Sequence, residues 1–153
     1  MTINHEYVSA VGSLTAVDIE AEAGFSPVRL FWIKDVPIGV TRGKHAHKIT
    51  NQYLMCVSGV VQLNTFDGKT WRTVVLFAGM STLLPAMVWG EQIFLADNTV
   101  LLVACDTLYD RDDYIENMAL FHETVTGLNA GAVGADINEG APVPPMFNGA
   151  VRV

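Results

Sequence analysis

Short apolar segments of at most seven residues, separated by turn signals, recur along most of this chain. They are rich in β-branched and aromatic residues, and no stretch before Asp110 shows a helical hydrophobic period. Many short strands at this spacing predict an all-β sandwich or barrel. The predicted strands are Ser13–Ile19, Val28–Lys34, Asn51–Val57, Val60–Phe66, Thr70–Leu76, Ser81–Leu84, Gln92–Leu95 and Val100–Asp106.

The clearest local feature is a hairpin in which Asp67-Gly68 supplies the positive φ angles of a two-residue turn between Val60–Phe66 and Lys69–Val75. Asp110–His122 is the one segment with the pattern of a helix. The residues after it are rich in Gly, Ala and Pro and poor in core side chains. We therefore expect one domain over residues 1–122, then a loosely ordered tail, or an arm laid on a neighbour, over residues 123–153.

Composition limits the partners of this domain. The chain has 9 Lys and Arg against 16 Asp and Glu, so its net charge of −7 gives no general attraction to nucleic acid or an anionic membrane. Cys56 and Cys105 lie in apolar runs and lack the spacing of a disulfide framework, which indicates buried thiols in a reducing compartment. No signal peptide is evident, and no apolar run approaches the roughly 20 residues of a membrane span. We expect a soluble, cytoplasmic protein that binds neither nucleic acid nor membrane.

The segment around His45 and His47 carries the residues of a chemical site. Residues two apart on a strand point to the same face, so both imidazoles are expected to face the mouth of a barrel. The spacing resembles the first cupin motif, which here starts at Gly39 and has Gln52 at its acidic position. A counterpart of the second motif starts at Gly79. The resemblance implies an all-β cupin, a double-stranded β-helix or jelly-roll barrel, with a short C-terminal helix and tail.

Two of the four usual metal ligands of a cupin are replaced. Gln52 stands at the acidic position, and Gly90 stands where a third histidine is expected. Two imidazoles and an amide make a weak site for a divalent metal, which usually has three strong ligands and an open position. The sequence therefore favours a site without metal.

The segment Arg42-Gly-x-His45-Ala-His47-Lys48, followed by Gln52, is narrower than the general cupin pattern. It resembles the WxcM-like sugar 3,4-ketoisomerases, which act on dTDP-4-keto-6-deoxyglucose. The resemblance extends over roughly residues 12–121 and includes Pro27–Ile33, Cys56–Gly59, Pro85–Trp89, Val100–Val103 and Tyr109–Ile115. It implies an isomerase that moves a keto group on a dTDP-linked deoxysugar, in deoxyamino-sugar biosynthesis for a surface polysaccharide such as the O-antigen of lipopolysaccharide.

That reaction removes the C3 proton next to a C4 ketone and returns a proton to C4 through an enediol. It needs a base with a near-neutral pKa and neither a metal nor a redox cofactor, so His45 and His47 are the expected catalytic residues. The residues themselves do not separate the two roles, although the resemblance favours the first histidine. The expected substrate contacts are made by Gln52 or Arg42 at the enediolate, by Arg29 and Arg42 at the pyrophosphate, and by Trp89 or Trp32 through stacking.

Two departures from the family pattern leave alternatives open. Val11 lies in a stretch where an acidic residue and an arginine are common in the family, and Gly90 replaces a basic or polar residue. The alternatives are a metal-dependent small-molecule cupin and a non-catalytic nucleotide-sugar-binding cupin. The open edge of such a barrel favours a homodimer, and the resemblance implies one as well, because members of the family form homodimers.

Overall fold

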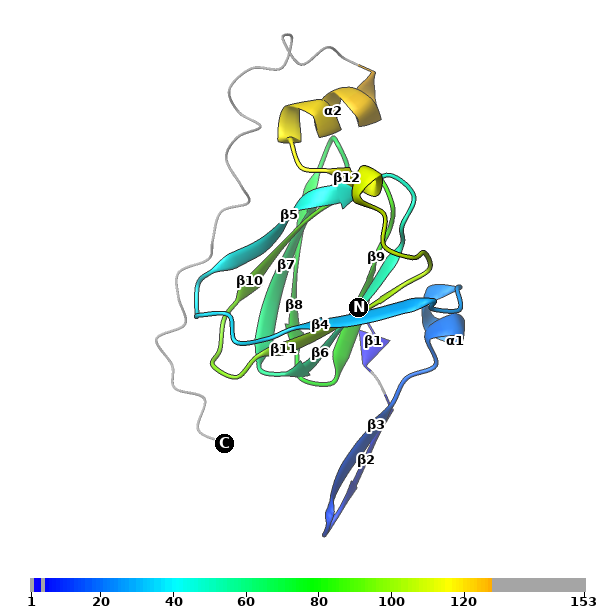
Figure 1. Cartoon of the computed structure of the whole chain (residues 1–153). Helices are drawn as coiled ribbons and strands as arrows, with labels where there is room; N and C mark the ends of the chain where they lie inside the picture. The colour runs from blue at the N-terminus through cyan, green and yellow to red at the C-terminus, as the bar shows by residue number, and fades with distance from the viewer. Residues whose placement is uncertain (1, 4, 128–153) are drawn as a thin grey trace.

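The computed structural model describes residues 2, 3 and 5–127, in which two five-stranded antiparallel sheets face each other (Figure 1). The first sheet has the order β1 (Thr2–Ile3), β9 (Met80–Leu84), β6 (Gln52–Ser58), β11 (Val100–Cys105) and β4 (Arg29–Ile33). The second has the order β12 (Tyr114–Ile115), β5 (Thr41–His47), β10 (Trp89–Phe94), β7 (Val60–Phe66) and β8 (Trp71–Phe77). This arrangement confirms the predicted all-β fold.

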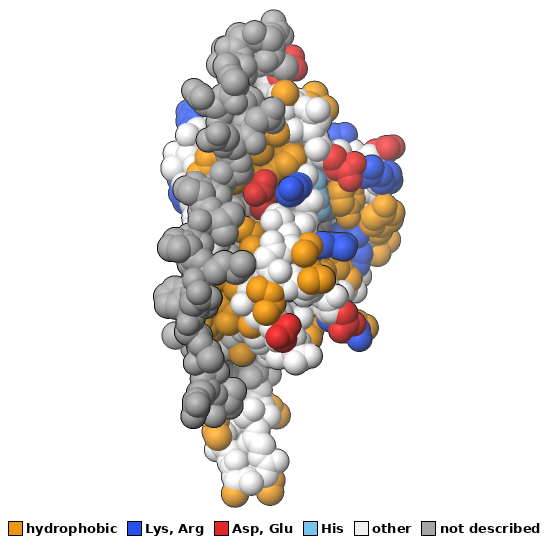
Figure 2. Space-filling view, turned by 90° about the vertical axis from the view of Figure 1, so that its left-hand side faces the viewer, with side chains coloured by type: hydrophobic (Ala, Val, Ile, Leu, Met, Phe, Trp, Pro, Cys, Tyr) orange, Lys and Arg blue, Asp and Glu red, His pale blue; other side chains and the backbone are white. Residues whose placement is uncertain are grey.

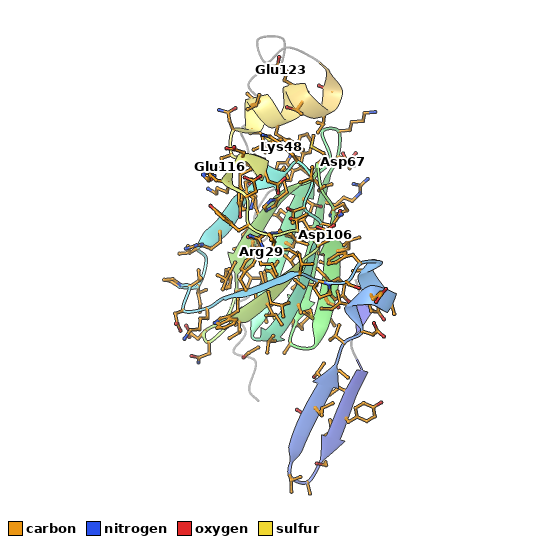
Figure 3. All side chains as sticks on the ribbon, turned by 45° about the vertical axis from the view of Figure 1, so that its right-hand side comes forward. Arg29, Lys48, Asp67, Asp106, Glu116 and Glu123 are labelled. Carbon is orange, nitrogen blue, oxygen red and sulfur yellow. The ribbon has the colours of Figure 1, made fainter. Side chains whose placement is uncertain are left out.

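The core lies between the two sheets, where side chains fill the barrel along its length (Figure 3). Alternation along the strands explains which residues face inward: Val61 and Leu63 of β7 point into the core, two residues apart. They meet Leu54 and Cys56 of β6 and Leu101 of β11, all of which are at most 1% exposed. The apolar runs therefore make this main cluster between the sheets, a second cluster that includes Phe121 of α2 and a third around Tyr53.

The predicted hairpin is present, but its turn is longer than expected. Phe66 pairs with Trp71, so residues 67–70 form a four-residue loop rather than a two-residue turn. The Asp67 carboxylate explains the difference, because it accepts hydrogen bonds from the backbone N–H groups of Lys69 (3.0 Å) and Thr70 (2.8 Å). Gly68 supplies the one positive φ angle, +92°, that the loop needs.

The predicted helix over Asp110–His122 is wrong in its first half. Arg111–Asp113 form a single 3-10 turn (η1), Tyr114–Ile115 form β12, and the helix α2 spans Met118–Thr126. Tyr114 pairs with His47 of β5, so tertiary pairing overrides the helical pattern there. Helix α2 starts at the cap Asn117 and extends past residue 122, and the rest of the predicted tail lies outside the described residues.

The N-terminal region contains three elements that the pattern did not predict: β1, β2 (His5–Ser9) and the helix α1 (Ile19–Ala23). β2 pairs with β3 (Gly12–Ala16), and this hairpin, which we call the N-terminal arm, projects away from the barrel (Figures 1 and 2). The predicted strand Ser13–Ile19 ends at Ala16, because Asp18 caps the short helix α1 by accepting from the Ala21 N–H. Neither α1 nor α2 is long enough to cross a membrane, and these are the helices of the described part.

Candidate active site

Strand β5 brings the two histidines together at one end of the barrel. Their rings lie 5.0 Å apart, centroid to centroid, at an interplanar angle of 82°. Gly43, with a φ of +81°, and a register shift between Gly90 and Glu91 of the neighbouring strand bend β5 just before His45. A Cβ on Gly43 would lie 2.7 Å from the Gly90 carbonyl oxygen, so this close approach of the strands requires glycine.

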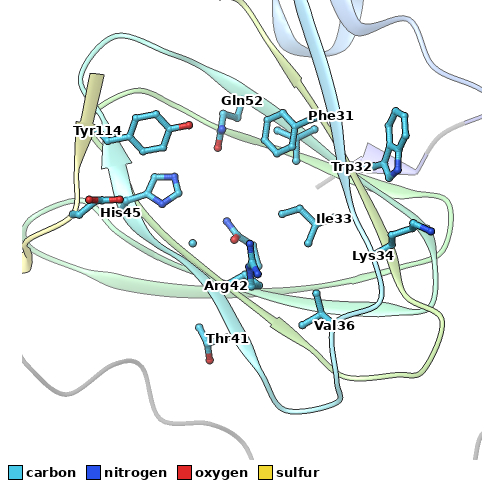
Figure 4. Close-up of a pocket in the computed structure, with 14 residues that line it drawn as sticks. Phe31, Trp32, Ile33, Lys34, Val36, Thr41, Arg42, His45, Gln52 and Tyr114 are labelled. Atoms are coloured by element: carbon cyan, nitrogen blue, oxygen red, sulfur yellow. The ribbon is translucent and has the colours of Figure 1, made fainter. Parts of the chain in front are cut away.

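His45 lines a cavity of about 770 Å³ that opens between β4 and β5 (Figure 4). Tyr114 and Gln52 lie beside it, and Arg42 lies across the cavity from them. This volume suits a small-molecule ligand. The lining residues are Phe31, Trp32, Ile33, Lys34, Val36, Thr41, Arg42, Gly43, His45, Gln52, Gln92, Val103, Tyr114 and Glu116.

His45 is a neutral base facing this cavity. Burial lowers its pKa below the ordinary 6.5, and the repulsion that would arise if His45 and His47 were both protonated acts in the same direction. A hydrogen bond to the Gly43 backbone acts against the shift without cancelling it. At neutral pH the imidazole of His45 is therefore free to accept a proton.

His47 lies behind His45 and is 3% exposed. Its Nδ1 atom is 2.6 Å from Asp113 Oδ2, and its Nε2 atom is 3.2 Å from Gln52 Nε2. Burial lowers the pKa of His47 and outweighs the opposing effect of the Asp113 carboxylate. The neutral ring thus donates from Nδ1 to Asp113 and accepts the Gln52 amide N–H at Nε2.

Asp113 is held as a carboxylate by three donors. It accepts hydrogen bonds from the Thr50 hydroxyl and from the Ile49 backbone N–H (2.8 Å), besides His47. Burial acts to raise the pKa of Asp113, but these hydrogen bonds outweigh it and the pKa is lowered. The structure therefore distinguishes two histidines that the sequence could not: His45 opens to the cavity, and His47 is engaged on both ring nitrogens.

The other predicted substrate contacts divide into two groups. Arg42, Gln52 and Trp32 line the cavity, with Trp32 63% exposed at its rim. Arg29 is not among the lining residues: its Nη2 donates to Cys105 Sγ (3.3 Å), and its guanidinium lies 5.6 Å from the Phe31 ring centroid. Arg29 thus lies behind the cavity wall.

Trp89 lies in the core rather than at the cavity. It is 4% exposed and packs with Phe66, Ile115 and Phe121 under helix α2. Its Nε1 donates to Glu91 (3.2 Å), so the polar atom of the ring is also satisfied inside the fold. The structure therefore gives no support to stacking of a ligand on Trp89.

The two positions that depart from the family pattern also have structural explanations. Val11 is 97% exposed at the tip of the N-terminal arm, away from the cavity of its own chain. Gly90 pairs directly with His45, and a Cβ there would lie 2.7 Å from Leu84 Cδ2. A histidine at this position would therefore require the Leu84 side chain to move. Within the described part no three His, Cys, Asp or Glu side chains form a group that could hold a metal ion.

Sequence reasoning missed three residues of the site: Asp113, Tyr114 and Glu116. All three lie in the segment read as a helix, where a helical assignment points them in different directions. The signal that could have found them is the run Asp112-Asp113-Tyr114, since acidic and phenolic side chains near a histidine pair are common partners of catalytic groups.

Comparison with known proteins identifies relatives over most of the chain. The TDP-4-oxo-6-deoxy-alpha-D-glucose-3,4-oxoisomerase of Aneurinibacillus thermoaerophilus is 28% identical over 123 residues, which are 80% of this chain and 88% of that protein. The crystal structure of QdtA, a sugar 3,4-ketoisomerase from Thermoanaerobacterium thermosaccharolyticum in complex with TDP, superimposes with a TM-score of 0.75 and 26% identity, over 81% of this chain and 91% of that one.

A third likeness is to the WlaRB TDP-quinovose 3,4-ketoisomerase of Campylobacter jejuni, with a TM-score of 0.73 and 28% identity, over 79% of this chain and 94% of the other. Residues 2–126 match the model of the family described as "FdtA: WxcM-like, C-terminal". This match includes β1 to α2 and therefore every residue that lines the cavity. The chain belongs to the WxcM-like, C-terminal family.

Proposed function

We propose that this protein is a 3,4-ketoisomerase that converts a dTDP-linked 4-keto-6-deoxyhexose to its 3-keto isomer. The observation that carries the proposal is the neutral, cavity-facing His45, backed by a second histidine that Asp113 and Gln52 hold in one tautomer. The three relatives, each named as a 3,4-oxoisomerase or 3,4-ketoisomerase, support the same reaction.

The chemistry starts with His45 as the carbon base. It takes the proton from C3, and the electron pair of that bond becomes part of a C3–C4 double bond as the C4 ketone becomes an enolate. The protonated His45 then returns its proton to C4, and C3 becomes the ketone. No electrons leave the sugar, so the residues described need no redox partner for this step.

Hydrogen-bond donors around the cavity stabilise the intermediate. The Arg42 guanidinium faces the cavity from the wall opposite His45 (Figure 4) and is the donor available to the intermediate, because the Gln52 amide already donates to His47 Nε2 (3.2 Å) and Cys105 Sγ (3.9 Å). Donors fixed before the reaction stabilise a developing oxyanion without reorganisation. Arg42 and Lys34 are the cavity cations that suit a pyrophosphate, and the exposed Trp32 ring suits stacking of a base or sugar.

The decisive experiment follows the sugar by NMR in D₂O. Metal-free protein is incubated with dTDP-4-keto-6-deoxyglucose, and we expect deuterium at C3 of the recovered substrate and at C4 of a new 3-keto product. His45→Asn should reduce the rate by about 10²- to 10⁴-fold, the usual contribution of a general base. His122→Asn is the matched control, because His122 lies on α2 against Phe66 and does not line the cavity.

Other outcomes of this experiment select the alternatives. Turnover that depends on added Fe, Mn, Ni or Zn, and that chelation abolishes, would replace the proposal with a metal-dependent cupin. Tight binding of the dTDP-sugar without exchange or isomerisation would replace it with a nucleotide-sugar-binding module. Neither outcome is compatible with His45 acting alone as the carbon base.

The functional unit is proposed to be a homodimer. The N-terminal arm leaves Tyr7, Val8 and Leu14 between 59% and 76% exposed, which gives this projecting hairpin an apolar surface. A lone two-stranded hairpin is marginal in water, so packing against a second copy would stabilise it. We place the reaction in the cytoplasm, in the synthesis of a deoxyamino sugar for a surface polysaccharide, as the substrate class implies.

A further inference from the structure

The reaction moves a second proton that a carbon base does not handle. Once C3 is deprotonated, the intermediate carries a hydroxyl on C3 and an oxyanion on C4. The 3-keto product requires the reverse, an oxyanion on C3 and a hydroxyl on C4. One proton must therefore pass from O3 to O4, and this inference rests on the proposed ketoisomerase reaction.

Most polar groups of the cavity are unsuited to that transfer. Guanidinium groups such as Arg42 remain protonated, and the Gln52 amide does not titrate. Lys34 pairs with Asp35 (3.1 Å), and Glu116 pairs with Arg111 (2.6 Å). His47 has both ring nitrogens engaged, by Asp113 and by Gln52.

Tyr114 is the remaining lining residue with an ionisable hydroxyl, and its position is suitable. Its ring centroid lies 4.9 Å from that of His45 and 4.4 Å from that of His47. Its hydroxyl points across the cavity towards Gln52, on the same side as the His45 imidazole (Figure 4). A sugar carbon within reach of His45 therefore has its oxygens within reach of this phenol.

Two guanidinium groups lie close to the Tyr114 side chain. The Arg111 guanidinium lies 5.5 Å from the Tyr114 ring centroid. Burial acts to lower the pKa of Arg29, but hydrogen bonding and charge at Cys105 and Tyr114 outweigh it and raise the pKa. Arg29 therefore interacts with Tyr114 as well as with Cys105.

We propose that the Tyr114 hydroxyl relays the proton from O3 to O4 of the enediolate. The phenol donates its proton to the C4 oxyanion, and the resulting phenolate takes the proton of the C3 hydroxyl. The phenol is restored within one turnover, and His45 is restored by its transfer from C3 to C4. Two bonds to hydrogen break and two form in each pair of transfers, so no further reactant is needed.

The test separates exchange at C3 from formation of product. In Tyr114→Phe the ring still packs against both histidines, so in D₂O we expect deuterium to enter C3 at a rate close to that of wild type. Formation of the 3-keto sugar should fall by about 10²-fold or more. His45→Asn, in contrast, should lose both exchange and product.

Tyr109→Phe is the matched control, because its ring lies 5.9 Å from that of Tyr114 but it does not line the cavity. It should leave both rates unchanged. A parallel fall of exchange and product in Tyr114→Phe would overturn the relay, and so would unchanged product formation. Turnover by the wild-type protein in the same experiment tests the ketoisomerase activity by itself. A failure of the proton relay can therefore be distinguished from a failure of the proposed function.

Discussion

The Nδ1 atom of His47 lies 2.6 Å from the Oδ2 atom of Asp113, and both side chains are buried. This contact fixes the tautomer of His47, which in turn directs its Nε2 atom to Gln52 at the cavity. A carboxylate that does not line the cavity thereby orients His47 and Gln52. Asp113 is a positioning residue.

Replacing this carboxylate tests the positioning role. Asp113→Asn keeps the shape of the side chain but removes its charge, so His47 loses its fixed tautomer and we expect kcat to fall by about 10²-fold with KM little changed. Steady-state kinetics and the pH profile of kcat measure the effect. Asp112→Asn is the control, because Asp112 is exposed and does not contact His47. An equal loss in both variants would contradict the role.

The pH dependence of activity follows from His45. The base must be neutral, and burial lowers its pKa below the ordinary 6.5, so kcat/KM should stay constant from neutral pH down to about 6.5 and fall only below it. Measuring kcat/KM between pH 4.5 and 8 locates the pH at which the activity falls. An acidic limb centred above 6.5 would contradict the neutral, buried base.

Stability should follow pH in the same direction. The folded-state pKa values of His45 and His47 are lowered, so the unfolded chain binds more protons in this range. The contribution of the two neutral histidines to the free energy of unfolding is fully present above about pH 6.5, which is the pKa of histidine in the unfolded chain. It is lost as the pH falls through their lower pKa values in the folded protein. The melting temperature of wild type should drop between pH 7 and pH 5, and the double variant His45→Asn, His47→Gln should show a smaller drop.

Gly43 and Gly39 form a matched pair for testing the bend in β5. Both have a φ of +81°, but a Cβ on Gly43 would lie 2.5 Å from Gln92 Oε1 and 2.7 Å from the Gly90 oxygen, whereas nothing lies within 4 Å at Gly39. Gly39→Ala should cost about 1 kcal/mol of backbone strain. Gly43→Ala should cost about 1–3 kcal/mol more and also lower kcat, because His45 is displaced. Urea denaturation of both variants measures the difference, and equal costs would contradict the close approach.

The oligomeric state depends on the N-terminal arm. Tyr7 and Leu14 lie opposite each other on one face of the hairpin, so Tyr7→Ser with Leu14→Ser removes the apolar surface proposed to meet a second copy. Light scattering at micromolar concentration should show a dimer for wild type and a monomer for the double variant. Glu6→Gln with Thr15→Ser changes another cross-strand pair of the same hairpin and should leave the dimer intact. A monomeric wild type would contradict the dimer.

The sequence predicted the strands well because their signal is local. Apolar alternation and turn residues predicted the hairpin of β7 and β8. The spacing of His45 and His47 predicted that both lie on one strand, which is β5. The segment Asp110–His122 failed because the pairing of Tyr114 with His47 depends on a strand far away in the chain. A helical pattern alone carries no information about such a partner.

The sequence predicted those residues of the site that lie in local sequence patterns, and it missed those whose role depends on contacts across the fold. The histidine pair, Gln52, Arg42 and Trp32 belong to runs with recognisable patterns, and the structure brings all but His47 to the cavity wall. Trp89 lies elsewhere because side chains alternate along β10: Gln92 faces the cavity, and Trp89, three residues before it, faces the opposite side under α2. The roles of Asp113 and Tyr114 depend on distances across the fold, which residue spacing does not contain.

The pairing of β12 with β5 also orders events during folding. His47 and Asp113 are 66 residues apart in sequence, so closing the loop between them costs more chain entropy than forming a local hairpin, and we expect their contact to form late. Until β12 docks, the wall that carries Tyr114 is missing and both histidines face water. Catalytic competence should therefore be among the last properties that a newly made chain acquires.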